Sequence, residues 1–149
     1  MIAEDSKAEE ILAVIQAVNA IGRAADSKDW IACGRCFTQN VSIDHDAGSG
    51  EPSSMTPDEL MAAWQKALGV FTSTLHMVTN HDVEIHGDRA VCRSYVQALH
   101  VAAETTAANH YLTFGTYEHG LTRMAEGWRV NRVVYRQAYA LGNPSLFPH

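Results

Sequence analysis

The second half of the chain restricts the fold most, because it contains four long extended segments in succession. The stretches 75–85, 89–101, roughly 110–125 and 128–141 are rich in β-branched and aromatic residues. The strings "HGD" and "EG" that separate two pairs of them are typical of tight turns. Strands joined by such short turns pair antiparallel with their neighbours. We therefore expect one large, curved sheet.

The first half of the chain predicts three helices. Apolar residues recur at helical spacing from Lys7 to about Ala25, which indicates one amphipathic helix. The string "DSKD" ends it, and Asp29 can cap a short second helix over residues 30–37. Thr56 and Glu59 form a capping box that begins a third helix, with Pro at its first position. The apolar side of this third helix carries Leu60, Met61, Trp64 and Leu68.

Between the second and third helices lie a strand and a loop. "VSIDH" (41–45) alternates β-branched and polar residues, and "DAGSGEPSSM" (46–55) is rich in Gly, Ser and Pro. Three helices followed by a run of strands predict an α+β fold with a curved sheet wrapped around the helices. A length of 149 residues suits a single domain, with residues 1–7 and 143–149 as flexible or tail segments.

Composition and charge exclude several classes of protein. The formal charge is −6 and no basic cluster occurs, so we expect no nucleic-acid partner. No apolar run approaches the ~20 residues that span a bilayer, and the start "MIAEDSKAEE" does not resemble a signal peptide. Three cysteines without an export signal favour reduced thiols. We expect a cytoplasmic protein whose partner is a small molecule.

The string "WIACGRCF" (30–37) has the C-x-x-C spacing of a redox pair or half a zinc site. A thioredoxin-type pair needs a preceding strand and a βαβ surround, and a zinc site needs four ligands, whereas only Cys92 remains as a further thiol. We interpret Cys33 and Cys36 as small, buried, reduced residues. Histidine spacings typical of metal sites are also absent from the sequence. We therefore expect neither a metal nor a cofactor.

A more informative pattern is an ordered set of motifs: "ADSKDW" (25–30), "TLHMVTN" (74–80), "HGDRAVCRSYVQALH" (86–100) and "EGWRV" (126–130). In order and spacing they resemble the SnoaL-like branch of the NTF2-like superfamily, and within it scytalone dehydratase. The resemblance extends from about residue 10 to 141. It implies an α+β cone, in which three N-terminal helices pack in a strongly bent mixed or antiparallel sheet that encloses a deep pocket.

The resemblance also implies a catalytic set. Asp26 matches an aspartate at the end of the first helix, and His76 and His100 match two strand histidines. In scytalone dehydratase these three residues serve base-initiated elimination of water. A bacterial dehydrochlorinase of the same superfamily shares the aspartate and the first histidine. We expect the Asp26–His76 pair to act as the base and His100 as the acid.

The residues expected to bind the substrate depart from that family. Ala25 and His45 stand where scytalone dehydratase has two tyrosines, and Thr116 and Glu118 fall near its serine and asparagine. We expect His45, Trp64, Thr116 and Glu118 to line the pocket. The alternative for His45 is a solvated strand end between Asp44 and Asp46. Scytalone itself is therefore not expected to be the substrate.

Turn geometry decides whether the two catalytic histidines share a face of the sheet. If "HGD" leaves three residues unpaired, His76 faces Ala98 and His100 lies diagonal to His76, about 7–8 Å away at Cβ. A two-residue "GD" turn shifts the parity and places the histidines on opposite faces.

Asp26 is unusual as a structural residue, because the helix dipole disfavours an anion at a helix C-terminus. Its carboxylate can take the Nδ1 proton of His76 and make Nε2 the basic nitrogen. The alternatives are a turn or cap role for Asp26, a satisfied core position for His76, and an exposed strand end for His100.

These features predict a lyase that carries out a dehydratase-type elimination on a small cyclic or aromatic-like carbonyl compound. Two alternatives are a non-catalytic NTF2-like binding protein and a structural β-type subunit of a ring-hydroxylating oxygenase. We also expect a homodimer or homotrimer, with the outward faces of strands 89–101 and 110–125 in the contact. The tail "GNPSLFPH" should pack over the pocket or a neighbour through Leu146 and Phe147.

Overall fold

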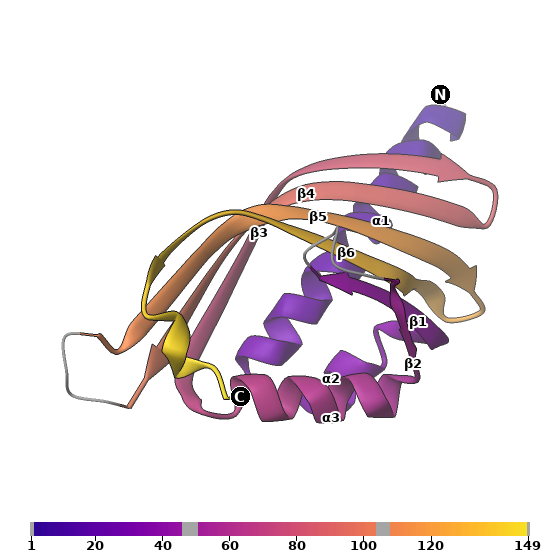
Figure 1. The fold of residues 1–149 in the computed structure, drawn as a ribbon. Helices are drawn as coiled ribbons and strands as arrows, with labels where there is room; N and C mark the ends of the chain where they lie inside the picture. The colour runs from indigo at the N-terminus through magenta and orange to yellow at the C-terminus, as the bar shows by residue number, and fades with distance from the viewer. Residues whose placement is uncertain (1, 46–50, 104–107, 149) are drawn as a thin grey trace.

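The computed structural model describes residues 2–45, 51–103 and 108–148, with side chains from residue 6 onward. Within them the chain forms three α-helices, six strands and a final 3₁₀ turn (Figure 1). The elements are α1 Ile2–Asp26, α2 Trp30–Gly34, β1 Phe37–His45, β2 Ser53–Met55, α3 Pro57–Leu68, β3 Phe71–His86, β4 Arg89–Ala102, β5 His110–Met124, β6 Gly127–Gly142 and η1 Pro144–Leu146.

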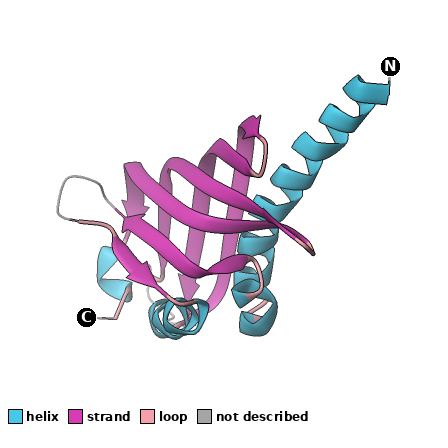
Figure 2. Ribbon diagram, turned by 90° about the vertical axis from the view of Figure 1, so that its right-hand side faces the viewer, coloured by secondary structure: helices cyan, strands magenta, loops and turns pink. Residues whose placement is uncertain are grey.

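The strands form a mixed sheet in the order β2-β1-β6-β5-β4-β3, with β2 and β3 as its edges. The pairing is antiparallel except between β1 and β6, which run parallel. The sheet arches over the three helices, and α1 runs along its β3 side (Figures 1 and 2). The predicted α+β architecture is therefore confirmed, and the parallel β1–β6 pair makes the sheet mixed.

Local capping sets the helix boundaries as the sequence predicts. The Asp29 side chain accepts a hydrogen bond from the backbone N–H of Ala32 at 3.0 Å, which caps α2. Thr56 and Glu59 form the reciprocal capping box of α3.

Three expected boundaries were wrong. The first helix already begins at Ile2, Phe37 belongs to β1 rather than to the second helix, and Ser53–Met55 pairs with β1 as β2. The rest of the expected loop, apart from residues 51 and 52, lies outside the described residues.

The turn between β3 and β4 is shorter than the three-residue turn that was expected to place His76 opposite Ala98. His86 pairs with Arg89, so the turn has two residues, and its first, Gly87, adopts a φ of 60°. The register then shifts between Thr79 and Asp82, where β3 carries one extra residue.

This β-bulge restores the parity that the short turn reverses. Asn80 lies in it with a φ of 57°, a left-handed conformation that Asn tolerates better than most residues. As a result His76 does face Ala98, for a different reason than the one expected.

The core lies between α1, α2 and the concave face of the sheet. Its fully buried members include Val14 and Val18 of α1, Cys33 of α2, Val41 of β1 and Val130 of β6. Within the described residues no helix is long and apolar enough to cross a membrane.

Candidate active site

A cavity of about 510 Å³ opens between the helices and the concave face of the sheet. Most of its wall is apolar and comes from α1, α3 and the strands, with Val18, Leu60, Trp64 and Val133 among its lining residues. Histidines and tyrosines supply much of its polar surface. Cavities of this size and composition are typical of small-molecule sites.

Asp26, the last residue of α1, is bonded to β3 through both carboxylate oxygens. Oδ1 lies 2.6 Å from Nδ1 of His76 and accepts a hydrogen bond from the Thr74 hydroxyl at 2.9 Å. Oδ2 accepts the backbone N–H of His76 at 2.8 Å. Both side chains are largely buried, at 14% exposure for His76 and 16% for Asp26. These bonds compensate the carboxylate for its position at a helix C-terminus.

The bonds also fix the ionisation of Asp26. Burial acts to raise the pKa of this carboxyl, but the hydrogen bonds from the ring and backbone N–H of His76 and from Thr74 outweigh it, so the pKa lies below its usual value. Because an ionised carboxylate only accepts hydrogen bonds, Nδ1 of His76 must carry a proton. His76 lines the cavity. With Nδ1 protonated, Nε2 is the ring nitrogen that can act as a base.

A glycine lets α1 approach His76 closely. A Cβ built at Gly22 would lie 3.1 Å from Cβ of His76, which is tighter than ordinary packing. Gly22 therefore contributes to the short Asp26–His76 distance, although it lies in a helix interior where glycine is unfavourable.

His100 of β4 faces the same cavity as His76 and is only 5% exposed. The two imidazole rings are 6.0 Å apart between centroids and nearly perpendicular. Nδ1 of His100 lies 3.1 Å from the backbone carbonyl of Tyr111, and because a carbonyl only accepts, this nitrogen carries the proton. Burial lowers the pKa of His100, although the bond to the carbonyl partly opposes it. His100 is therefore a neutral ring with an unprotonated Nε2.

Aromatic rings surround His100 at one end of the cavity. The rings of Phe71 and Phe147 both have centroids about 5 Å from its own, at 5.1 and 5.0 Å, and Tyr111 lies at 6.2 Å. Phe147 follows η1 and lines the cavity, as expected for the C-terminal tail. Leu146 does not appear among the lining residues.

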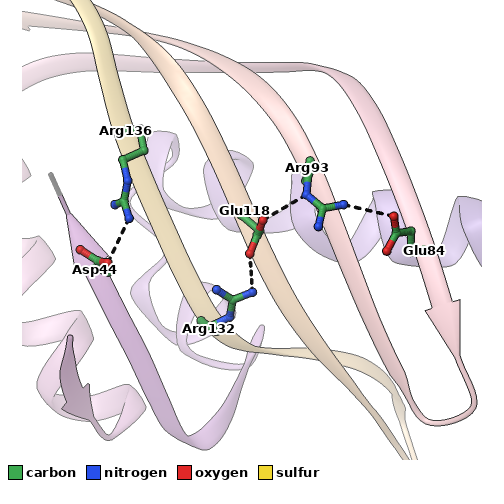
Figure 3. Close-up of polar contacts among 6 residues, drawn as sticks. All are labelled: Asp44, Glu84, Arg93, Glu118, Arg132 and Arg136. Atoms are coloured by element: carbon green, nitrogen blue, oxygen red, sulfur yellow. Dashed lines mark hydrogen bonds and ion pairs between the residues drawn. The ribbon is translucent and has the colours of Figure 1, made fainter. Parts of the chain in front are cut away.

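Of the four residues expected to bind the substrate, His45 and Trp64 line the cavity. Thr116 and Glu118 do not, because they lie on the convex face of the sheet and line a separate depression there. Glu118 bonds to Arg93 and Arg132, in a row of ion pairs that Figure 3 shows across the strands. The expected placement of these two residues in the pocket was wrong by one position, and in a strand one position exchanges the faces.

The residues that β5 does direct into the cavity are Tyr111, Thr113, Tyr117 and His119. Sequence reasoning missed them, together with Tyr135 and Gln137 of β6. Alternate residues of a strand face the same side of the sheet, so the sequence shows that these odd-numbered residues share a face. It does not show which of the two faces lines the cavity, because the alignment with the family could shift by one residue here.

Burial shifts the pKa values of two residues of this set, Tyr117 and His119. Burial is the main cause that raises the pKa of Tyr117 well above its usual value, so its hydroxyl stays protonated. Burial also lowers the pKa of His119 to about 3, with smaller contributions from His81 and Arg132. Both side chains are therefore neutral near neutral pH.

The C-x-x-C pair lies away from the cavity lining. Cys33 is buried, Cys36 is half-buried rather than fully buried as expected, and neither forms a disulfide. Burial raises the pKa of Cys33 to about 12 and also raises that of Cys36, so both thiols are protonated. Among the described residues, no group of three or more His, Cys, Asp or Glu is placed to hold a metal ion.

Comparisons with known structures identify the fold. A protein from Kribbella flavida, Kfla4162, superposes with a TM-score of 0.85 at 26% identity, over 96% of this chain and 97% of the other. A protein from Novosphingobium aromaticivorans, provisionally assigned as a scytalone dehydratase, gives a TM-score of 0.82 at 15% identity, over 94% and 91%. Hexachlorocyclohexane dehydrochlorinase LinA-type3 from Novosphingobium barchaimii gives 0.70 at 16% identity, over 89% and 92%.

No curated protein sequence gives a significant match to the chain. Residues 6–134, however, match the family model of the SnoaL-like domain, which covers most of the sequence. With an NTF2-like arrangement of helices and sheet, the chain belongs to the SnoaL-like domain family.

Proposed function

We propose that the protein is a lyase that eliminates water from a small cyclic carbonyl compound bearing a hydroxyl group β to the carbonyl. The observation that carries the proposal is the 2.6 Å contact between Asp26 and His76, a residue that lines the cavity. Structural relatives that are assigned to dehydration and dehydrochlorination support a lyase-type reaction. Both reactions remove a carbon-bound proton and expel a leaving group.

The proposed reaction begins with proton abstraction. Nε2 of His76 takes the proton from the carbon α to the carbonyl, and the electron pair of the C–H bond forms an enolate. The imidazolium that results is stabilised by the Asp26 carboxylate on its other nitrogen. The enolate then expels the β-hydroxyl group, which takes the proton from His76 and leaves as water. His76 returns to its neutral form, and the product is the conjugated carbonyl compound.

His100 requires a different role from the acid expected from the resemblance. Its proton resides on Nδ1 and is held by the Tyr111 carbonyl, and burial disfavours a second proton on the ring. We assign Nε2 of His100 the task of accepting a hydrogen bond from the substrate hydroxyl. This bond would orient the leaving group toward His76, whose ring is 6.0 Å away.

Tyr117 supplies a hydroxyl that the expected tyrosine positions lack. Its protonated phenol belongs to a half-buried residue of the cavity lining and can donate to the carbonyl oxygen, where negative charge develops in the enolate. Ala25 and His45 stand at the two positions where scytalone dehydratase has tyrosines. In this chain Tyr117 of β5 would supply the hydroxyl donor from another wall of the cavity.

A second candidate is a small-molecule binding protein without turnover. Ala25 favours it, because this lining residue places a methyl group rather than a hydroxyl beside Asp26. The two candidates make the same prediction for binding and opposite ones for turnover.

Turnover is tested with cyclic β-hydroxy ketones of one and two rings, such as 3-hydroxycyclohexanone and 3-hydroxy-1-tetralone. Loss of water is followed by mass spectrometry for the wild type, His76→Ala and Asp26→Asn. The proposal predicts turnover by the wild type that falls by at least about a hundredfold in His76→Ala. Binding without loss of water from any of these compounds would support the binding protein instead.

A further inference from the structure

Thr74 is a buried residue that contacts the Asp26–His76 pair without lining the cavity. It lies on β3 two residues before His76, so both side chains point to the same side of the sheet. Thr74 is 5% exposed, and its hydroxyl donates to Oδ1 of Asp26 at 2.9 Å. Among the described residues that line the cavity Thr74 does not appear. Any effect that it has on a bound molecule must therefore pass through Asp26.

The hydroxyl of Thr74 holds the carboxylate independently of the His76 ring. Within the described residues this carboxylate accepts three hydrogen bonds, of which the ring and the backbone of His76 supply two. The torsion that turns a carboxylate is soft, and an imidazole ring can follow such a turn. Thr74 supplies the third bond from a β-branched side chain, which has few accessible rotamers. Its hydroxyl thus fixes Oδ1 at the position that meets Nδ1 of His76.

The same hydroxyl favours the ionised form of Asp26. Burial acts to raise the pKa of this carboxyl, and the bond from Thr74 is one of the contacts that lower it. A protonated carboxyl could donate to Nδ1 of His76, and the neutral ring would then carry its proton on Nε2. In that tautomer Nε2 cannot accept a proton from a substrate. A donor to Asp26 therefore protects the tautomer in which Nε2 is the base.

A hydroxyl at this position is not required by the sheet. Valine has almost the same shape as threonine, is favoured in strands and would bury no polar group. A strand threonine can also bond to a backbone carbonyl, as the hydroxyl of Thr72 does to Val101 at 3.0 Å. Thr74 instead gives its single hydroxyl proton to a carboxylate.

We propose that Thr74 is a positioning residue for the base: its hydroxyl holds the Asp26 carboxylate so that His76 keeps its proton on Nδ1 and leaves Nε2 unprotonated. The proposal rests on the proposed function in taking His76 as the base. It adds to the site a residue that contacts neither the substrate nor the cavity.

Four variants separate this role from a purely structural one. Thr74→Val removes the hydroxyl and keeps the shape of the side chain, so that His76 alone holds the carboxylate. Thr74→Ala also lacks the hydroxyl and is measured in the same way if the valine variant does not fold. Thr74→Ser keeps the hydroxyl. Thr72→Val is the matched control, because it removes a hydroxyl of the same strand that does not bond to Asp26.

The ¹⁵N resonances of the His76 imidazole report the tautomer without any substrate. They are recorded above the pH range in which the ring takes up its second proton. In the wild type and in Thr72→Val, Nδ1 should be protonated and Nε2 unprotonated. In Thr74→Val the two resonances should move toward each other, because both tautomers are populated, and Thr74→Ser should restore most of their separation. A purely structural Thr74 would lower the free energy of unfolding in Thr74→Val and leave the resonances unchanged.

Exchange of the α-protons of 1-tetralone in D₂O measures the base directly. In Thr74→Val the exchange rate at saturation should fall about tenfold, the effect of one hydrogen bond to a charged group, while the dissociation constant of 1-tetralone stays within about twofold. The rate of Thr74→Ser should stay within about threefold of the wild type. Thr72→Val should exchange at the wild-type rate.

Unchanged ¹⁵N resonances in a folded Thr74→Val protein would overturn the proposal, as would a wild-type exchange rate in that variant. An equal loss in Thr72→Val would overturn it as well. Failure of the proposed function gives a different result, in which the wild type neither exchanges 1-tetralone nor eliminates water. The ¹⁵N resonances of His76 would still decide the role of Thr74 in that case.

Discussion

Asp26 accepts two hydrogen bonds from His76. One carboxylate oxygen lies 2.6 Å from the ring nitrogen Nδ1, and the other lies 2.8 Å from the backbone nitrogen. Asp26 ends α1, whereas His76 lies in the middle of β3, so the pair joins the helix to the edge strand of the sheet. The same contact therefore serves the fold and orients the imidazole. Variants that separate these two effects are the informative ones.

Gly22→Ala should reduce activity without reducing stability. The new methyl group would lie 3.1 Å from Cβ of His76 and would push α1 away from the ring. Alanine in a helix interior is more favourable than glycine by up to about 1 kcal/mol, which offsets the crowding in the free energy of unfolding. Urea unfolding and the rate of water loss, measured on the same preparation, check both effects.

Gly34→Ala is the matched control for this variant. Its added Cβ would meet only the Met61 side chain at 3.4 Å, so the rate should not change. Equal rates for Gly22→Ala and the wild type would show that the close approach of α1 does not matter for catalysis.

Deletion of Asn80 should remove His76 from the cavity. With the two-residue turn at Gly87, the extra residue of β3 keeps His76 opposite Ala98, and its loss would reverse the faces of residues 71–79. Asn80→Gly keeps the residue count and accommodates the φ of 57°, so it should preserve the pairing. The test is the low-field ¹H resonance of His76 Nδ1–H, which should persist in Asn80→Gly and vanish in the deletion. A normal signal in a folded deletion protein would contradict this role of the bulge.

His119 should make the folded state less stable in acid. Its pKa is about 3 in the folded protein and near 6.5 in an unfolded chain, so the unfolded state takes up the proton first as the pH falls. The stabilisation is complete above about pH 6.5 and is lost toward pH 3, at up to about 1.4 kcal/mol per pH unit.

His119→Phe removes this contribution and isolates it from those of His81 and His100, whose pKa values are also lowered. Between pH 6.5 and pH 5, the wild type should lose about 2 kcal/mol more unfolding free energy than the variant. Urea unfolding at the two pH values measures it. Equal losses would mean that the folded state accommodates a protonated His119.

Self-association through the convex face of the sheet remains a prediction. Several apolar side chains there are exposed, at 49% for Leu75, 43% for Met77, 59% for Tyr95 and 61% for Tyr139. Light scattering at micromolar concentration should give the mass of a dimer or trimer, and Tyr95→Lys combined with Tyr139→Lys should lower it. Leu12→Lys, on an exposed position of α1, should not. A monomeric wild type would contradict the prediction.

The sequence predicted the elements whose determinants are local. The caps at Asp29 and Thr56 depend on residues within one helical turn, and the resemblance identified Asp26, His76 and His100, which the structure does bring together. The bulge at Asn80 could not be predicted, because it arises from the fit of β3 against β4 and no local pattern marks it. An error of one residue in the alignment of β5 with the family likewise placed Thr116 and Glu118 in the cavity. Tyr117 and His119 line it instead.

The most direct test of the proposed base is hydrogen–deuterium exchange at the α-carbon of 1-tetralone in D₂O, followed by NMR. This ketone has no leaving group, so exchange reports proton abstraction alone. The account predicts exchange above the buffer rate for the wild type, its loss in His76→Ala, and a strong reduction in Asp26→Asn, which keeps the shape of the carboxylate but not its charge. His100→Ala should lose less than His76→Ala. Exchange in Asp26→Asn or His76→Ala equal to that of the wild type would contradict the account, as would no exchange by the wild type of 1-tetralone that is shown to bind.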